Sequence, residues 1–373
     1  MRMPQKSQSK PMNATISPTT VIVGLSGGVD SAVAACLLIE QGYSVTGLHI
    51  RTLDDSPDSA ELVASTLVVS DLDEYRFPVF SLNLSNSFRE HVIKTFQKDY
   101  LAGKTPNPCT LCNKLIKWEG LLKGAQLCGA EYVATGHYAR IQHSDSSCRL
   151  LKGVDNKKDQ SYFLWMLGRK TLEKTLFPLG EYSKPEVRQL ARRFGIRAAE
   201  KTESQEICFV GDNNYRQFLK SSIPGLEQSV QGGDIIDEEG SVIGHHTGYP
   251  FYTIGQRKGL GISSSEPLYV TTIDPKRNRI HVGGKQKLAC SRLEAGQLNW
   301  IGIAPPERPL KALGRIRYRD QESACTIIPL DGDRIEVLFD EPKNAVTPGQ
   351  AIVFYHEEEL LGGGVITAAC PSA

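Results

Sequence analysis

Apolar runs alternate with helical patterns through the first half of the chain. Four runs have the apolar character of buried strands: 21–25, 44–50, 75–84 and 130–140. Helical patterns follow them at 31–41, 87–102, 113–128 and 182–196. Gly42 would end the first helix, and Ser183 and Glu186 have capping-box spacing at the start of the last one. This alternation predicts a parallel sheet covered by helices on both faces.

The pattern changes after about residue 225. Pairs of alternating apolar runs surround Gly, Asn, Asp or Pro turns at 233–244, 268–283, 325–342 and 349–366. Successive hairpins without helices between them predict small β modules. With boundaries near 210 and 288, the chain divides into a flexible tail (1–18), an α/β domain (19–210), a small central β-rich domain (211–287) and a C-terminal β domain (288–373).

Composition narrows the class of protein only slightly. The 373 residues carry 43 Lys and Arg against 42 Asp and Glu, so a net charge of +1 neither favours nor excludes a nucleic-acid partner. No apolar run approaches the roughly 18 residues that span a membrane, and we expect no membrane partner. The first twenty residues are basic without an apolar signal core. They predict a solvated tail and a cytoplasmic protein; the alternative is an organellar transit peptide.

The stretch SGGVDS joins the first strand to the first helix. Free backbone N–H groups and the positive end of the helix dipole would meet there, which favours an anion, most often phosphate. Gly27 and Gly28 let the backbone approach a ligand, and Ser26 and Ser31 add hydroxyl groups. A capped tight turn is the alternative, but the hydroxyls, Asp30 and the strand–helix frame favour nucleotide binding. The stretch matches neither the dinucleotide-binding pattern G-x-G-x-x-G nor the Walker pattern G-x-x-x-x-G-K-[ST]. The Walker pattern would supply a lysine to the β and γ phosphates.

This stretch resembles the PP-loop of ATP pyrophosphatases, which split ATP into AMP and pyrophosphate while adenylating a carbonyl or carboxyl oxygen. The resemblance implies that the loop holds the pyrophosphate end of ATP and that Asp30 lies near a Mg²⁺ ion. An ATP-dependent activating enzyme is therefore expected.

The nine cysteines are odd in number and scattered, unlike a secreted disulfide framework. Four lie in apolar patterns and are predicted to be small core residues: Cys36, Cys128, Cys290 and Cys325. In GKTPNPCTLCNKLIKW, two prolines predict an extended loop, and Cys109 and Cys112 would stand just before a helix whose N-terminus favours thiolates. Such a pair can be inert, bind zinc, form a redox pair or ligate an Fe–S cluster. Zinc is disfavoured because a second C-x-x-C is lacking. Cys208 follows on a strand-like edge.

Six further stretches carry a second resemblance: TPNPCTLCN, ATGHYAR, NKKDQSYFLW, SQEICFVG, HHTGYPFYTIGQRKGLGI and VTPGQAIVFY. In order and spacing, from Val21 to about Ile366, they resemble the tRNA-specific 2-thiouridylases. These enzymes replace the C2 oxygen of the wobble uridine by sulfur, and Lys, Glu and Gln tRNAs are the expected substrates. The resemblance implies a PP-loop domain, a small central domain and a tRNA-binding C-terminal β-barrel. It also implies sulfur delivery by a cysteine desulfurase or a relay protein.

By motif position, the resemblance implies three groups of site residues. ATP would be bound by Gly24, Leu25, Ser26, Gly27, Gly28, Val29, Asp30, Ser31, Ile50 and Gly136. Transfer RNA would be contacted by Asn107, Pro108, Cys109, His137, Lys158, Asp159, Gln160, Arg317, Tyr318 and Gln350, with the first three at the target base. Cys208 would carry a persulfide, and Cys112 would attack it to release hydrosulfide or would close a disulfide with it.

One position departs from the family pattern. Many members have aspartate, proposed as a general base, where this chain has Cys109. Cys109, Cys112 and Cys208 could instead hold a [4Fe–4S] cluster with one open iron for hydrosulfide. Persulfide relay and cluster-bound sulfide therefore both stay open.

The RNA-binding prediction has weaker support from the residues alone. GRIRYRD would place Arg315, Arg317 and Arg319 on one strand face, although such faces are more often merely solvated. Three rivals also remain: a PP-loop amide-forming synthetase acting on a small metabolite, a non-catalytic tRNA-binding protein, and a cytidine-sulfurating relative. The paired cysteines and the C-terminal domain oppose the first, the intact loop opposes the second, and GQRKGLGI opposes the third.

Overall fold

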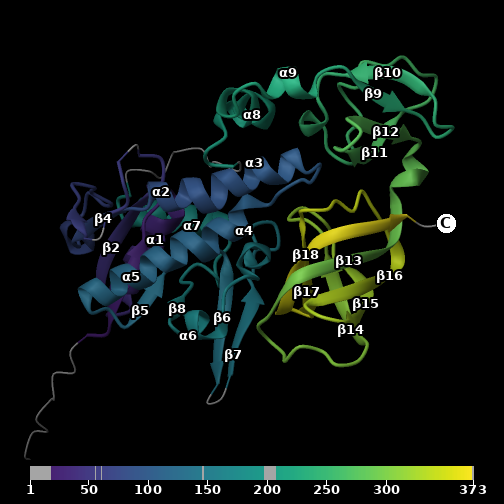
Figure 1. The fold of residues 1–373 in the computed structure, drawn as a ribbon. Coiled ribbons are helices and arrows are strands. Elements are labelled where there is room, and N and C mark those ends of the chain that lie inside the picture. Colours follow the sequence, from purple (N-terminus) through teal and green to yellow (C-terminus); the bar gives the residue numbers. More distant parts are fainter. Residues whose placement is uncertain (1–17, 55, 60, 145–146, 197–206, 372–373) are drawn as a thin grey trace, which may run out of the picture.

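The computed structural model describes residues 18–371 apart from 55, 60, 145–146 and 197–206. Figure 1 shows an α/β domain (purple to teal), a small central domain (green) and a C-terminal barrel (yellow). The predicted N-terminal tail lies outside the described residues except for Pro18. None of the described helices is both long and apolar enough to cross a membrane.

The α/β domain contains a six-stranded sheet in the order β3-β4-β2-β1-β5-β8. Its strands are β1 (Thr20–Gly24), β2 (Ser44–Arg51), β3 (Val63–Ala64), β4 (Val79–Asn83), β5 (Tyr132–Ala134) and β8 (Thr175–Leu176). All neighbours are parallel except the edge strand β3. Because the carboxyl ends of parallel strands share one edge, the segments that follow β1, β2 and β5 meet there.

Helices cover both faces of this sheet, which confirms the predicted fold class. Val21 and Val23 share an apolar cluster with Leu38 of α1 (Val29–Glu40), whereas Ile22 faces α5 (Glu119–Cys128). Helix α7 (Lys184–Arg193) packs beside α1 and begins with the predicted capping box. The remaining short elements of this domain are α6 (Arg169–Glu173) and the 3₁₀ turns Asp73–Tyr75, Ser161–Leu164 and Gly211–Asn213.

Two long helical segments contain π-helical turns. The first runs through α2 (Ser85–Phe88), a π segment (Arg89–Ile93) and α3 (Lys94–Leu101). The second runs through α4 (Pro108–Cys112), a π segment (Asn113–Trp118) and α5. The prediction that Cys109 and Cys112 precede a helix was wrong, since both lie inside α4. Pro108 occupies the first turn, where its missing N–H and fixed φ are tolerated, so the helix begins there.

The central domain is a four-stranded sheet with two helices. Its elements are α8 (Tyr215–Ser222), α9 (Leu226–Val230), β9 (Gly233–Ile236), β10 (Val242–His246), the 3₁₀ turn Tyr249–Phe251, β11 (Tyr269–Asp274) and β12 (Arg279–Gly283). The strand order β10-β9-β12-β11 contains both predicted hairpins.

The C-terminal domain is a closed antiparallel barrel. After the 3₁₀ turn Lys285–Leu288, its strands are β13 (Ala289–Trp300), β14 (Leu310–Arg315), β15 (Ser323–Leu330), β16 (Arg334–Asn344), β17 (Ala351–His356) and β18 (Glu359–Pro371). Pairing of β13 with β18 closes the barrel, as predicted for this domain. A hairpin of the α/β domain, β6 (Ala139–Ser144) and β7 (Ser147–Lys152), joins β18 through the pair Glu359↔Leu151. The two domains therefore share one sheet.

Candidate active site

The loop after β1 has the geometry of an anion site. Gly27 takes φ +76°, a left-handed conformation suited to glycine, and Gly28 is the N-cap of α1 without a side-chain cap bond. The first N–H groups of the helix therefore lack a capping side chain. The hydroxyl oxygens of Ser26 and Ser31 lie 3.3 Å apart, and Ser31 Oγ donates to the Gly28 carbonyl at 3.2 Å. These features fit a bound phosphate.

The neighbouring predicted ATP-binding residues surround this loop. A Cβ added to Gly136 would lie 2.6 Å from the Asp30 carbonyl carbon and 2.7 Å from the Ser31 nitrogen, so this close approach requires glycine. Ile50 lies at the carboxyl end of β2 and packs against α5 beside Gly120. The carboxyl ends of β1, β2 and β5 thus share one edge of the sheet, where ligands bind in parallel α/β folds.

Asp30, in the first turn of α1, is held by two residues from distant segments. Lys184 Nζ lies 2.7 Å from Asp30 Oδ1, and the Tyr138 hydroxyl donates to the same oxygen at 2.9 Å. The Lys184 side chain is 9% exposed and that of Asp30 is 32% exposed. Sequence reasoning missed both partners, although Lys184 stands beside the capping-box Ser183 that it did identify.

The three candidate sulfur-chemistry cysteines come from two segments. Cys112 is buried and Cys109 half-buried on α4, whereas Cys208 is exposed in a turn that follows the gap at 197–206. The strand-like edge predicted around Cys208 was wrong, because residues 208–210 form a turn and bend. Burial is the main cause that raises the pKa of Cys109 and Cys112, and Cys208 adds a smaller increase at both, so Cys208 lies within electrostatic reach of the other two thiols.

Burial controls the protonation of these thiols. It raises the pKa of Cys112 to about 11 and also raises the pKa of Cys109 and Cys208. The Lys117 ammonium opposes this effect at all three. The expectation that the helix N-terminus favours thiolates is therefore wrong for this state, because desolvation disfavours the charged form more strongly than the nearby positive charge favours it.

His137 connects the cysteines to the nucleotide loop. Burial and, to a smaller extent, the Lys117 ammonium together lower its pKa to about 3, so the imidazole is neutral. Thr135 Oγ1 lies 2.8 Å from His137 Nδ1, and Trp118 and Phe177 pack around the ring. Gly136 touches the loop, and the ring of His137 lies 5.5 Å from that of Trp118 in the helical segment that begins with Cys109 and Cys112, so these two residues link the loop to the cysteine helix.

The barrel fixes the segment that precedes the cysteines. Gln350 Nε2 donates to the carbonyl oxygens of Thr105 at 2.9 Å and Pro106 at 3.1 Å. Thr105 N donates to the Pro348 carbonyl at 2.9 Å. Gln350 is half-buried, and its two hydrogen bonds connect the barrel to the residues just before Asn107, the N-cap of α4.

Comparison with known proteins decides the family. Residues 19–212 match the family described as tRNA methyl transferase HUP domain, 216–284 the tRNA methyl transferase PRC-barrel domain, and 290–366 the aminomethyltransferase beta-barrel domain. The tRNA-specific 2-thiouridylase MnmA of Chlorobium phaeobacteroides is 66% identical over 94% of this chain and 97% of its own length. Those of Chlorobaculum tepidum and Geobacter metallireducens are 60% and 46% identical, over 96% and 94% of this chain and 98% and 97% of their own lengths. The chain belongs to the tRNA-specific 2-thiouridylase family.

Within this 2-thiouridylase fold, one predicted tRNA contact has an interior role. Asp159 is 3% exposed and pairs with Arg315 Nη1 at 3.2 Å. It also accepts hydrogen bonds from the backbone N–H groups of Gly153 and Ser161. The Asp159 carboxylate is therefore buried and engaged between the α/β domain and the barrel, and the tRNA contact expected of the segment 158–160 stays a prediction.

The predicted basic strand face is also wrong. Strand β14 ends at Arg315, which turns inward to Asp159, and residues 316–319 form a bend and turn. Arg317 and Arg319 remain exposed. Tyr318 is half-buried against Phe163, with ring centroids 4.5 Å apart. Because Arg315 forms a buried ion pair with Asp159, it does not share an exposed face with Arg317 and Arg319.

The other predicted tRNA contacts differ in exposure. Gln160 accepts a 3.0 Å hydrogen bond from Tyr138 N through Oε1, which ties it to the residue after His137. Lys158 and Asn107 are half-buried, and Pro108 is buried at the start of α4. Cys128, predicted to be a core residue, is instead exposed at the end of α5, whereas Cys36, Cys290 and Cys325 are buried as predicted.

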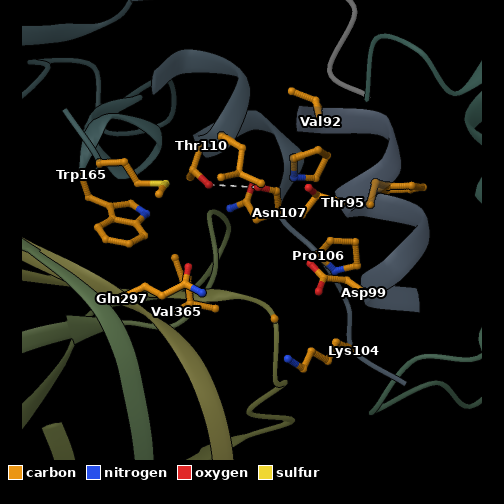
Figure 2. Close-up of a pocket in the computed structure, with 16 residues that line it drawn as sticks. Val92, Thr95, Asp99, Lys104, Pro106, Asn107, Thr110, Trp165, Gln297 and Val365 are labelled. Atoms are coloured by element: carbon orange, nitrogen blue, oxygen red, sulfur yellow. Dashed lines mark hydrogen bonds between the residues drawn. The ribbon is translucent and has the colours of Figure 1, made fainter. Parts of the chain in front are cut away.

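A cavity of about 140 Å³ lies on the barrel side of the 104–111 segment. Figure 2 shows Gln297 and Val365 of the barrel opposite Asn107 and Trp165. Neither Cys109 nor Cys112 lines it. The thiols therefore face a different side of α4 from this interdomain cavity.

The cysteine arrangement bears on the two sulfur hypotheses. Among the residues that the structure describes, no group of three or more His, Cys, Asp or Glu side chains is arranged to hold a metal ion. Cys109, Cys112 and Cys208 are also free thiols rather than disulfides. In this conformation the three thiols do not fit a [4Fe–4S] cluster, because they are not arranged closely enough together to ligate one metal centre.

Proposed function

We propose that this 2-thiouridylase uses ATP to replace the C2 oxygen of the tRNA wobble uridine by sulfur. One observation carries the proposal: Gly136 packs on the glycine loop, and the ring of the next residue, His137, packs on Trp118 in the helical segment that begins with Cys109 and Cys112. Activation and sulfur delivery must act on the same carbon atom, so both sets of groups must reach one base. The amide-forming synthetase alternative is not favoured by the family membership.

Activation would proceed at the loop. Uridine O2 attacks the α-phosphorus of ATP, the bond to the bridging oxygen breaks, and pyrophosphate leaves with the electron pair. The N–H groups of the α1 N-terminus and the hydroxyls of Ser26 and Ser31 are placed to bind its oxygens. Asp30, 32% exposed, is the carboxylate that we assign to a Mg²⁺ ion. The resulting O2–AMP ester makes AMP a good leaving group.

Sulfur transfer would use Cys208 and Cys112. Cys208 is exposed and can accept a sulfane sulfur from a cysteine desulfurase or relay protein, whereas Cys112 is buried. The Cys112 thiolate then attacks Cys208 Sγ, hydrosulfide leaves, and a Cys112–Cys208 disulfide forms. Hydrosulfide displaces AMP at C2, and a thiol reductant restores the cysteines. The half-buried Cys109 would adjoin the target base.

A tRNA substrate needs contacts beyond the flipped base. We assign exposed Arg317 to phosphate, and Tyr318, Lys158, Gln160 and His137 to the surrounding anticodon loop. Lys, Glu and Gln tRNAs are the proposed substrates, and the cytoplasm, where thiols stay reduced, the proposed location.

The deciding experiment is mass spectrometry of nucleosides from unmodified glutamate tRNA. The protein is incubated with ATP, Mg²⁺, cysteine and a cysteine desulfurase, beside a Cys208→Ala variant and a Cys128→Ala control. We expect 2-thiouridine with the wild type and the control and none with Cys208→Ala. Thiolation only after anaerobic reconstitution with iron and sulfide, with absorbance near 400 nm that Cys109→Ala removes, would replace the relay by the cluster. No thiolation under either condition would overturn the proposal.

A further inference from the structure

The nucleotide loop lacks a cation of its own. Between Lys10 and His49 the sequence contains no Lys, Arg or His, so β1, the loop and α1 bring only N–H groups, hydroxyls and the Asp30 carboxylate. Pyrophosphate carries about three negative charges near neutral pH, and developing phosphate charge is usually stabilised by a lysine, an arginine or a metal ion. Any side-chain cation that acts on this charge beside a Mg²⁺ ion must therefore come from another segment of the chain.

Lys184 supplies a cation at the loop. Its ammonium lies 2.7 Å from Asp30 Oδ1, and the Tyr138 ring lies beneath it, 5.8 Å from the nitrogen. The Lys184 backbone N–H donates to Asp155 Oδ2 at 3.0 Å, and the capping box fixes the preceding residue, Ser183. The backbone of Lys184 is thus held rigidly, while its side chain extends to the first turn of α1.

The position of Lys184 is not explained by the stability of its own helix. It is the first residue of the ten-residue helix α7, where the helix dipole disfavours a positive charge. Its side chain is 9% exposed, and burial of an ammonium group is unfavourable without a partner. Asp30 neutralises it, yet the Asp30 carboxylate is itself 32% exposed at the mouth of the loop and can be reached by a ligand.

We infer that Lys184 binds the pyrophosphate portion of ATP, exchanging its Asp30 partner for phosphate oxygens when the nucleotide enters the loop. This assignment rests on the proposed use of ATP. The ion pair with Asp30 keeps the ammonium charged and positioned while the loop is empty. In the reaction, the electron pair released at the α-phosphorus moves to the bridging oxygen of pyrophosphate, and Lys184 stabilises that charge. The side chain thus supplies the lysine that a Walker loop carries within its own sequence.

The test is calorimetric titration of the full chain with pyrophosphate, with AMP and with the α,β-methylene analogue of ATP, each with Mg²⁺. Lys184→Met should bind pyrophosphate and the analogue about 10- to 100-fold more weakly, the range for loss of one charged hydrogen bond, and AMP within about twofold of wild type. Lys184→Gln, which keeps a donor for Asp30, should show the same selective loss. Lys184→Arg should retain most affinity. Lys170→Met, an exposed lysine of α6, is the matched control and should bind like wild type.

The outcomes separate this inference from the proposed function. Unchanged pyrophosphate binding by folded Lys184→Met or Lys184→Gln, beside a wild type that binds it, would overturn the role of Lys184 alone. Equal weakening of AMP and pyrophosphate would also overturn it, because that result indicates a structural effect on the loop. A wild-type chain that binds none of the three ligands would overturn the proposed use of ATP, and this assignment with it.

Discussion

Gln350 donates a 2.9 Å hydrogen bond from Nε2 to the carbonyl oxygen of Thr105, 245 positions earlier in the chain. The next carbonyl, that of Pro106, accepts from the same amide at 3.1 Å. A barrel residue thus holds the backbone that leads into Asn107 and the cysteine helix. The family resemblance assigns Gln350 to RNA contact, whereas its bonds here give it a positioning role.

Gln350→Ala is therefore expected to lower kcat more than it raises KM for tRNA. A misplaced segment at the target base reduces turnover by about 10- to 100-fold, whereas RNA affinity still depends on phosphate contacts elsewhere. Arg317→Ala provides the contrast. Loss of this exposed side chain should raise KM for tRNA and reduce the salt dependence of binding, with kcat unchanged. Steady-state thiolation kinetics at several salt concentrations measure both. Gln350→Ala with a higher KM and normal kcat would assign Gln350 to RNA contact instead.

The Asp159–Arg315 pair joins the α/β domain to the barrel in a buried setting. Arg315→Met leaves the Asp159 carboxylate without its cation, and we expect the free energy of unfolding to fall by about 3–5 kcal/mol. Replacing both residues, as Arg315→Met with Asp159→Asn, removes both charges but keeps an acceptor for the N–H groups of Gly153 and Ser161, and should recover much of this loss. Urea denaturation measures each value. Lys311→Met, which breaks the exposed pair with Asp340, is the control and should change stability by at most about 1 kcal/mol. Equal effects in the buried and exposed pairs would contradict the prediction.

Alkylation should report the electrostatic role of Lys117. Because burial raises the pKa of Cys112 to about 11, its reaction with iodoacetamide should accelerate as pH rises from 7 to 10, and more steeply than that of exposed Cys128. Lys117→Met removes the charge that lowers this pKa, so the Cys112 profile should shift to higher pH. Lys114→Met, also exposed on this helical segment, should not shift it. Peptide mass spectrometry follows each cysteine, and an unshifted profile in Lys117→Met would refute the coupling.

His137 should make folding sensitive to acid. Its pKa falls from 6.5 to about 3 on burial, so the folded chain keeps it neutral while the unfolded chain binds a proton below pH 6.5. The stability that it contributes is present above pH 6.5 and is lost as pH falls toward 3. The difference in unfolding free energy between wild type and His137→Gln should therefore shrink over this range, as measured by urea denaturation at several pH values. A pH-independent difference for His137→Gln would contradict the assignment.

Local patterns in the sequence were sufficient for much of the fold. The apolar runs predicted the parallel sheet because strand and helix periods differ, and the hairpins after residue 225 carried their own turn residues. The capping box at Ser183 formed as predicted, since it depends on residues only three positions apart. The alternating pattern wrongly placed Arg315 on an exposed strand face with Arg317 and Arg319. In the structure Arg315 pairs with Asp159, a buried carboxylate from the α/β domain.

By itself, the sequence determined the glycine loop, the three cysteines and the family motifs, because each depends on residues adjacent in the chain. Tertiary structure alone decided which charges meet. Lys184 reaches Asp30 across 154 positions, and Gln350 reaches Thr105 across 245. It also decided that the pKa of Cys112 is raised, since that pKa depends on the atoms that exclude water from the thiol. Such contacts follow from the path of the folded chain in space, which no local pattern encodes.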